Sequence, residues 1–310
     1  MRKIFAFLCL GLVALYAKGQ VSVSILPQQY FVKQIAGDAV EVNVMVGKGA
    51  DPHTYEPKPK QMTALEKSDL YFAIGIEFEE AWLPKFQKSY PNLKIVKTDA
   101  GVEKIKFEGH HEHADHDHHD AKHEHADHDH HDAKHEHADH DHHDHEHHHG
   151  EFDPHIWLDP VSVKVQAKNI ATALSKKYPE NKALFEANLA KFEAQLDELD
   201  GFIKNTLANV KNREFIVYHP SWGYFAKRYD LEQIAIEVEG KEPKPAQLKE
   251  LIEEAKEHGV KVIFVAPQFS KKAAQTIAKE SGASVVEIDQ LPLDWDAELR
   301  KTAQILSKSL

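Results

Sequence analysis

The chain has 310 residues, which is long enough for two domains or for one large one. Its formal net charge is −12 at pH 7, but residues 110–149 alone contain 13 Asp or Glu and 2 Lys and so carry −11 of it. The remainder has a net charge near −1. No basic face therefore argues for nucleic acid as a partner, and the acidity belongs to one segment rather than to the fold.

The N-terminus has the pattern of a secretory signal peptide. A positively charged start precedes an apolar run, residues 4–15, that is too short to span a bilayer. Small residues then give a cleavage site near residues 17–19. We expect residues 1–19 to be a signal peptide that is removed on export, most simply to the periplasm.

The only cysteine, Cys9, lies inside this predicted signal peptide. The mature protein would then have no disulfide, no thiolate ligand and no cysteine nucleophile. No later stretch approaches 18 consecutive apolar residues, the length that predicts a membrane-spanning helix. We expect an exported soluble protein that is a monomer.

Strand-like and helix-like segments alternate at short spacing after the signal peptide. The predicted strands are residues 21–26, 40–46, 70–74 and 94–96, and the predicted helices are residues 28–35, 57–67 and 79–88. This alternation is typical of a parallel α/β domain.

Residues 110–149 contain twenty histidines in forty positions, interleaved with Asp and Glu. The segment is a repeat, because residues 111–122 recur unchanged at 123–134 and a third copy begins at His135. Such a composition cannot bury an apolar core, so residues 109–150 are predicted to be a disordered, solvated insert. Imidazoles and carboxylates are ligands of divalent metals, which makes metal binding the first interpretation. The alternative is a neutral surface loop that arose by repeat expansion.

Two helices are predicted directly after the insert. Asp159 and Pro160 form a good helix start, and this helix is expected to run to about Lys177. A second helix is predicted over residues 180–210 from apolar residues that recur every three or four positions, namely Phe185, Leu189, Phe192, Leu196, Leu199, Ile203 and Leu207. At 1.5 Å per residue this helix would be roughly 45 Å long, which is more than one small domain needs. We interpret it as a helix that links two lobes.

The last hundred residues repeat the α/β pattern. Strands are predicted at residues 215–218, 231–236, 261–265 and 284–288, and helices at 222–229, 245–258, 270–280 and 294–308. The predicted fold is α/β, with an N-terminal lobe over residues 20–179, the linking helix over 180–210 and a C-terminal lobe over 211–310.

Four histidines lie outside the histidine-rich segment, and three of them have marked contexts. His53, His155 and His219 each lie on a predicted connection, with prolines and aromatic residues close by. Connections are where α/β folds gather ligand groups, and stiff, partly dry surroundings suit a metal site. His258 instead ends a predicted helix just before Gly259, where an imidazole favours the exposed carbonyl groups.

Four motifs in the chain resemble those of the periplasmic solute-binding proteins of zinc and manganese ABC importers. They are DPHTYEP at 51–57, DPHIWLDP at 153–160, YHPSWGYFA at 218–226, and the segment 239–270. The resemblance implies two α/β lobes with mostly parallel sheets, joined by a long rigid helix, with one metal in the cleft between the lobes. It also implies ligands at His53 and His155 from the N-terminal lobe and His219 from the C-terminal lobe. A fourth, acidic ligand would be Asp289, although some zinc-specific members use water or another carboxylate there.

The ligand set implied by this resemblance favours zinc. Manganese-type members carry a carboxylate where this chain has His219, whereas three imidazoles with at most one carboxylate suit tetrahedral Zn²⁺. We therefore expect a receptor that captures Zn²⁺ and delivers it to the membrane permease and ATPase subunits of an ABC importer. The alternatives are a manganese or iron receptor of the same family, a stand-alone periplasmic zinc buffer or chaperone, and a secreted zinc metalloenzyme.

Two further features receive ordinary interpretations. His145–His149 matches the HExxH pattern, but where half the residues are histidine such matches arise by accident, and we expect no enzyme activity. Glu77, Glu79 and Glu80 form an acidic cluster that we interpret as the solvated start of a helix, with docking to a permease as the alternative.

Overall fold

The computed structural model describes residues 18–106, 152–237 and 241–310. The predicted signal peptide, except its last two residues, and all of the predicted histidine-rich insert lie outside these ranges. The first of these ranges contains a four-stranded parallel sheet in the order β2-β1-β3-β4. Its strands are β1 (Gly19–Val23), β2 (Val40–Val44), β3 (Leu70–Ala73) and β4 (Lys94–Lys97). The helices between them are α1 (Leu26–Ala36), α2 (Pro59–Glu66) and α3 (Glu77–Ser89).

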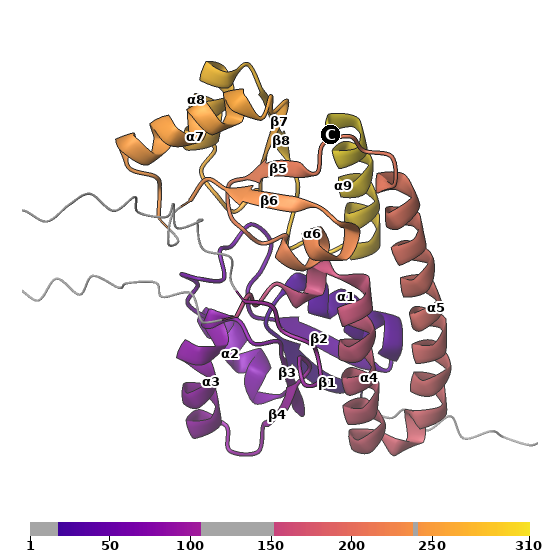
Figure 1. Ribbon diagram of the computed structural model, residues 1–310. Coiled ribbons are helices and arrows are strands. Elements are labelled where there is room, and N and C mark those ends of the chain that lie inside the picture. The colour runs from indigo at the N-terminus through magenta and orange to yellow at the C-terminus, as the bar shows by residue number, and fades with distance from the viewer. Residues whose placement is uncertain (1–17, 107–151, 238–240) are drawn as a thin grey trace, which may run out of the picture.

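A second four-stranded parallel sheet follows, in the order β6-β5-β7-β8. Its strands are β5 (Glu214–Val217), β6 (Glu232–Ala235), β7 (Val262–Val265) and β8 (Ser284–Glu287). The helices on this side are α6 (Gly223–Tyr229), α7 (Pro245–Glu257) and α8 (Lys272–Ser281). The two sheets lie one above the other in Figure 1. The predicted α/β fold with two parallel sheets is therefore confirmed.

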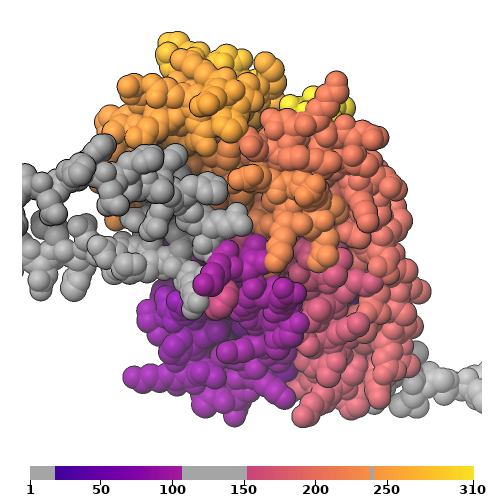
Figure 2. All heavy atoms as spheres, viewed as in Figure 1, coloured from indigo at the N-terminus to yellow at the C-terminus, as the bar shows by residue number. Residues whose placement is uncertain are grey.

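Two long helices form one side of the molecule, the first beside the first sheet and the second extending along both sheets (Figures 1 and 2). Helix α4 (Pro160–Lys177) begins as predicted, because the Asp159 carboxylate accepts hydrogen bonds from the backbone N–H groups of Val161 and Ser162. A short 3₁₀ turn, η2 (Pro179–Asn181), then leads into α5 (Lys182–Leu207). At 1.5 Å per residue α5 is roughly 39 Å long. It is shorter than predicted because Pro179 opens the turn and the helix ends at Leu207.

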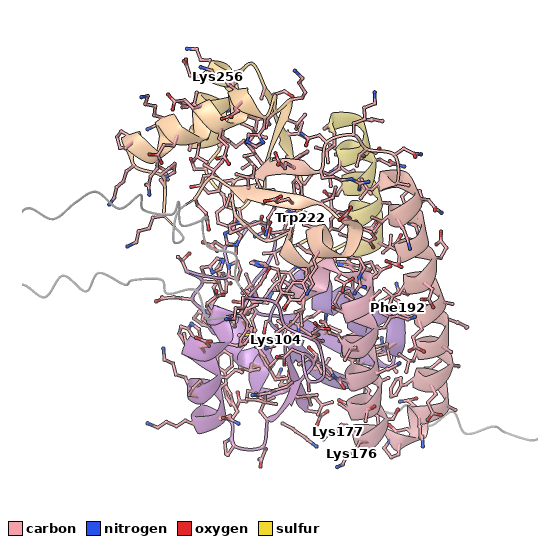
Figure 3. All side chains as sticks on the ribbon, viewed as in Figure 1. Lys104, Lys176, Lys177, Phe192, Trp222 and Lys256 are labelled. Carbon is pink, nitrogen blue, oxygen red and sulfur yellow. The ribbon has the colours of Figure 1, made fainter. Side chains whose placement is uncertain are left out.

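The last helix, α9 (Trp295–Ser309), returns from the second sheet to pack beside α1 and α5. The Trp295 ring lies 5.1 Å from the ring of Phe31 on α1. The Phe31 ring lies 6.1 Å from that of Phe192, which Figure 3 labels on α5. The indole N–H of Trp295 also donates to the carbonyl oxygen of Trp157, at 2.7 Å. The end of the chain is thus built into the first lobe's core.

One large apolar core therefore joins most of the molecule. It runs from the first sheet through α4, α5 and α9 to the inner residues Phe215, Val217 and Phe264 of the second sheet. A smaller, separate core lies between the second sheet and helices α7 and α8, and it is built around Ile216, Leu251, Ile263 and Ile277. The bounds predicted for the two lobes and for the linking helix stay a prediction.

Within the three described ranges, no helix combines the length and the apolar composition that crossing a membrane requires.

Candidate metal centre

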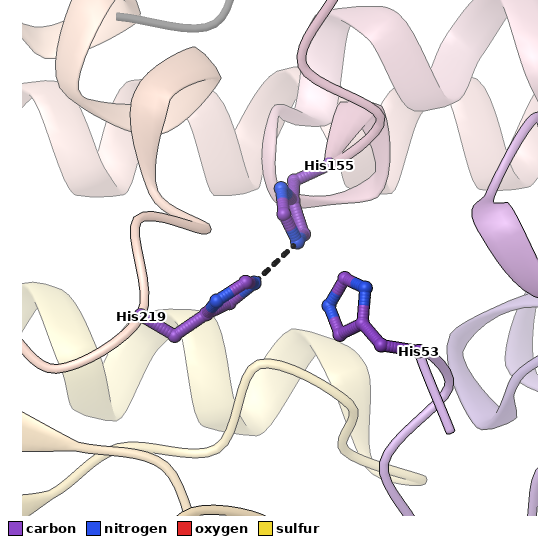
Figure 4. Close-up of side chains that lie close together, drawn as sticks. All are labelled: His53, His155 and His219. Carbon is purple, nitrogen blue, oxygen red and sulfur yellow. Dashed lines mark hydrogen bonds between the residues drawn. The ribbon is translucent and has the colours of Figure 1, made fainter. Parts of the chain in front are cut away.

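Three histidines that are far apart in the sequence meet between the two sheets (Figure 4). His53 lies in the loop that follows β2, and His219 comes directly after β5. His155 precedes the short 3₁₀ helix η1 (Ile156–Leu158) that leads into α4. One ring nitrogen of each lies within 4.8 Å of the others. Ligand groups gather in this way at the carboxyl ends of parallel strands.

His155 is buried, with only 2% of its surface exposed. Its Nδ1 lies 2.7 Å from Oδ1 of Asp153, and the same oxygen accepts the backbone N–H of His155 at 2.8 Å. A carboxylate can only accept, so Nδ1 carries the proton and Nε2 presents its lone pair to the centre of the group. This is how a carboxylate orients an imidazole for a metal.

His219 is held in the same way from the other lobe. It is 3% exposed, and its Nδ1 lies 2.7 Å from Oε1 of Glu237, two residues after β6. The ring of Phe269 stacks on the imidazole with centroids 4.8 Å apart and covers one face. The Nε2 atoms of His219 and His155 lie 3.2 Å apart. Since both Nδ1 atoms face carboxylates, both Nε2 atoms point to the same place, where a cation would bind.

His53 completes the group from the first lobe, and its ring centroid lies 5.0 Å from that of His219. Its side chain is 12% exposed, and its Nδ1 lies 3.4 Å from Oε2 of Glu77, the first residue of α3. Burial lowers the pKa of His53, but the hydrogen bond and charge of Glu77, together with the charges of Asp51 and Glu237, raise it, so the net pKa lies above the ordinary 6.5.

Asp289, the predicted fourth ligand, is not part of the three-histidine group. Its Oδ1 accepts a hydrogen bond from the Gln268 side chain at 3.0 Å and another from the backbone N–H of Leu291 at 2.9 Å. Its neighbour Gln290 accepts the indole N–H of Trp157 at 2.7 Å, and the Trp157 ring lies 5.1 Å from that of His155. Asp289 therefore lies on a loop that borders the site, with its Oδ1 engaged by Gln268 and Leu291.

The segment that carries His155 is tied tightly to the second lobe. Arg228 of α6 forms two hydrogen bonds of 2.9 Å with the Asp159 carboxylate, and Tyr224 of α6 donates to the carbonyl oxygen of Asp153. Gly223 approaches so closely that a Cβ there would lie 2.5 Å from the Asp153 carboxylate. His155 and His219 are thus fixed relative to each other across the lobes.

The acidic cluster differs from the prediction of a solvated helix start. Only Glu80 is exposed, because Glu77 faces His53 and Glu79 is buried. The Glu79 carboxylate accepts hydrogen bonds from the backbone N–H groups of Ile74 and Gly75, which lie in the turn before α3. The charge pattern predicted solvation, but the carboxylate instead fixes this turn. His258 lies at the end of α7 as predicted and contacts Glu214.

The sequence interpretation missed several supporting residues. Glu237 and Phe269 stand 18 and 50 positions after His219, and nothing in the local pattern pairs them with it. A signal was available only for Asp153, because an Asp two residues before a His can accept both its backbone N–H and its ring N–H.

The chain matches the family model described as "Zinc-uptake complex component A periplasmic" over residues 21–298. It is 34% identical to the high-affinity zinc uptake system protein ZnuA of Bacillus subtilis (strain 168), over 88% of this chain and 79% of that protein. It is 30% identical to the zinc-binding lipoprotein AdcA of Streptococcus pneumoniae (strain ATCC BAA-255 / R6), of which it spans only 48%.

Solved structures give the same picture. A structure described as the crystal structure of ZnuA superposes with a TM-score of 0.80 at 38% identity, covering 94% of this chain and 99% of that one. A zinc-bound ZnuA lacking residues 138–173 of its own numbering superposes with a TM-score of 0.79 at 38% identity, covering 94% and 98%.

Proposed function

The chain belongs to the family of the periplasmic component A of zinc-uptake complexes, and on that premise we propose that it is a zinc receptor that captures Zn²⁺ and delivers it to an ABC-type membrane permease. The observation that carries the proposal is the convergence of His53, His155 and His219. Three imidazoles form a nitrogen-rich donor set of the kind that Zn²⁺ accepts in tetrahedral coordination.

The three histidines bind the ion, and water or Asp289 completes its coordination. Asp153 and Glu237 keep His155 and His219 in the tautomer that offers Nε2, so these two ligands need no rearrangement before the ion arrives. Their negative charges also offset the charge of the dication in a buried place. The process is binding and release, and no covalent bond of a substrate is made or broken.

A receptor of this kind must also release the ion to the permease. The large apolar core joins both lobes, so loading is accompanied by small lobe movements rather than by wide closure. The ATPase subunit of the importer drives transport, and the receptor meets the permease outside the inner membrane. We place the protein in the periplasm as a monomer, after removal of a signal peptide near residues 17–19.

The histidine-rich insert has a separate role in this proposal. Its twenty histidines offer weaker, exchangeable sites that raise the local zinc concentration near the three-histidine group or respond to excess zinc. Tight binding does not depend on it. A manganese or iron receptor is the alternative within the same family, and a periplasmic zinc buffer is the alternative without a transporter.

The test is a zinc titration of the mature protein lacking residues 109–150, against a competing chelator. We expect one tight site, and we expect His219→Ala to remove it. If the shortened protein had no tight site, the histidine-rich insert would be the main binder and the buffer function would replace the receptor. Zinc uptake that persists in a strain lacking the protein would also contradict delivery to an importer.

A zinc metalloenzyme is the alternative from another class. A three-histidine zinc site with an open fourth position can activate water. We expect no hydrolytic or hydratase activity from the zinc-loaded protein. An activity that disappeared in His155→Ala would contradict the receptor proposal.

A further inference from the structure

Gln268, in the loop after β7, forms its hydrogen bond with Asp289, the predicted fourth ligand of the metal site. Its Nε2 donates to Oδ1 of Asp289 at 3.0 Å. The donor is unambiguous, because a carboxylate only accepts and the amide must therefore turn its NH₂ toward Asp289. The other amide atom, Oε1, is buried and has no hydrogen-bond partner among the described residues. Burying that oxygen is costly, and the charge-assisted bond to Asp289 offsets the cost.

The loop that carries Gln268 is also part of the metal centre. The next residue, Phe269, stacks on His219 with ring centroids 4.8 Å apart. On the other side, Gln290 binds the indole of Trp157, which lies against His155. Asp289 is therefore connected to the ring of His219 through Gln268 and the adjacent Phe269. Through the adjacent Gln290 and Trp157 it is also connected to the ring of His155. It borders the three-histidine group, while its Oδ1 is occupied by Gln268 and by the N–H of Leu291.

We propose that Gln268 determines the metal specificity of this receptor by holding the Asp289 carboxylate away from the ion. This inference rests on the proposed function, because it assumes that His53, His155 and His219 bind the cargo. With Asp289 held, the site offers three imidazole nitrogens and one position for water. With Asp289 released, the site gains a hard, charged oxygen donor and can expand its coordination.

The chemical consequence is a change of preference among divalent cations. Zn²⁺ readily adopts four-coordinate geometry with nitrogen donors, whereas Mn²⁺ prefers carboxylate oxygen donors and higher coordination numbers. When Gln268 holds Asp289 away from the ion, the site therefore loses more affinity for Mn²⁺ than for Zn²⁺. Gln268 acts as a positioning residue that touches the carboxylate and not the ion.

The experiment compares the Co²⁺-loaded wild type with Gln268→Leu, both lacking residues 109–150. Co²⁺ reports its geometry, because four-coordinate complexes absorb visible light much more strongly than five- or six-coordinate ones. We expect a strong four-coordinate spectrum from the wild type and a weaker one from Gln268→Leu. We also expect Gln268→Leu to bind Mn²⁺ about ten times more tightly, within the roughly 10- to 100-fold range of effects seen for residues that support metal ligands.

Two further variants make the result specific. In Gln268→Leu combined with Asp289→Asn, the wild-type Co²⁺ spectrum and Mn²⁺ affinity should return, because the released carboxylate is gone. Gln275→Leu places the same substitution on the exposed face of α8 in the same lobe and should change neither property. If Gln268→Leu unfolds, Gln268→Met provides the same test with an unbranched side chain that also lacks a donor.

Three outcomes would overturn the proposal. One is a Gln268→Leu protein with an unchanged spectrum and unchanged Mn²⁺ affinity. The second is a double variant that keeps the altered behaviour. The third is a Co²⁺ spectrum that changes in Asp289→Asn alone, because Asp289 would then already bind the ion in the wild type. A failure of the proposed function would look different, because wild type would then bind no zinc tightly or would keep that binding in His219→Ala.

Discussion

Two Asp-Pro-His turns in this protein share one sequence pattern and one backbone hydrogen bond, yet they support their histidines differently. In both turns the Asp side chain accepts the backbone N–H of the His two residues later, at 3.0 Å for Asp51–His53 and 2.8 Å for Asp153–His155. Only Asp153 also reaches Nδ1 of its histidine, at 2.7 Å. His53 relies instead on Glu77, at 3.4 Å and from another element.

The surroundings of the two turns explain the difference. The Asp153 turn lies under α6, which donates a hydrogen bond to its carbonyl and leaves no room for a side chain at Gly223. The Asp51 turn belongs to the loop between β2 and α2, and its neighbour Thr54 is exposed. The comparison indicates that His155 and His219 form a preorganised pair, and that His53 is the proposed ligand at the more accessible side of the site.

Removal of a ligand should have the largest effect and should separate the two turns. We expect His155→Ala and His219→Ala to lower the zinc affinity by more than the roughly 10- to 100-fold that loss of a supporting residue costs. We expect a smaller loss for His53→Ala, because the preorganised pair stays intact. Competition titrations against a chelator measure all three. Equal losses for the three variants would remove the distinction between the pair and His53.

Removal of a carboxylate partner should have the next largest effect. Asp153→Asn and Glu237→Gln should each weaken zinc binding by about 10- to 100-fold, because the amide no longer fixes the tautomer that offers Nε2. Glu77→Gln should cost less, because its contact with His53 is longer and its side chain is 25% exposed. The same titrations apply, with Glu80→Gln as an exposed control from the same helix. A larger loss for Glu77→Gln than for Glu237→Gln would reverse the comparison.

Proton competition should act first on His53. Although burial lowers it, its pKa is raised above 6.5 by the hydrogen bond and charge of Glu77 and by the charges of Asp51 and Glu237. A protonated imidazole cannot bind zinc, so affinity should fall as the pH is lowered, beginning above the range of an ordinary histidine. Glu77→Gln should move this fall to lower pH. Titrations between about pH 5 and 8 measure the shift, and an unchanged pH profile in Glu77→Gln would contradict it.

The smallest expected effect on zinc binding concerns Glu79, which fixes the turn before Glu77. Burial raises its pKa from 4.5 to about 7, although hydrogen bonds from Ser24, Ile74 and Gly75 oppose the rise. The folded protein therefore holds this proton more strongly than the unfolded chain. The associated stability is fully present below about pH 4.5 and is lost as the pH rises through about 7.

Glu79→Gln should flatten this part of the pH dependence of the free energy of unfolding. The expected change is on the order of 1–3 kcal/mol between the two ends of the range, with little change in zinc affinity. Urea unfolding of the metal-free protein measures it, and the exposed Glu80→Gln serves as the matched control. A Glu79→Gln protein with the pH dependence of Glu80→Gln would show that Glu79 is not the responsible group.

The local sequence determined the helices, the strands and the three histidines. Hydrophobic periodicity predicted α5 and both sets of strands, and the Asp159–Pro160 pair predicted the start of α4. His53, His155 and His219 could be singled out because prolines and aromatic residues stand directly beside them. These signals are local, because each one is formed by residues that are close together in the sequence, within a single helix, strand or loop.

The tertiary structure alone decided how the histidines are supported. Glu237 meets His219 because β5 and β6 are neighbours in the second sheet, and Glu77 meets His53 because α3 begins beside the loop after β2. The burial of Glu79 and the engagement of Asp289 by Gln268 likewise depend on contacts between distant segments. The sequence shows that a residue carries a charge. Whether that charge is buried, and which groups bond to it, depends on which strand ends and loops the fold brings together.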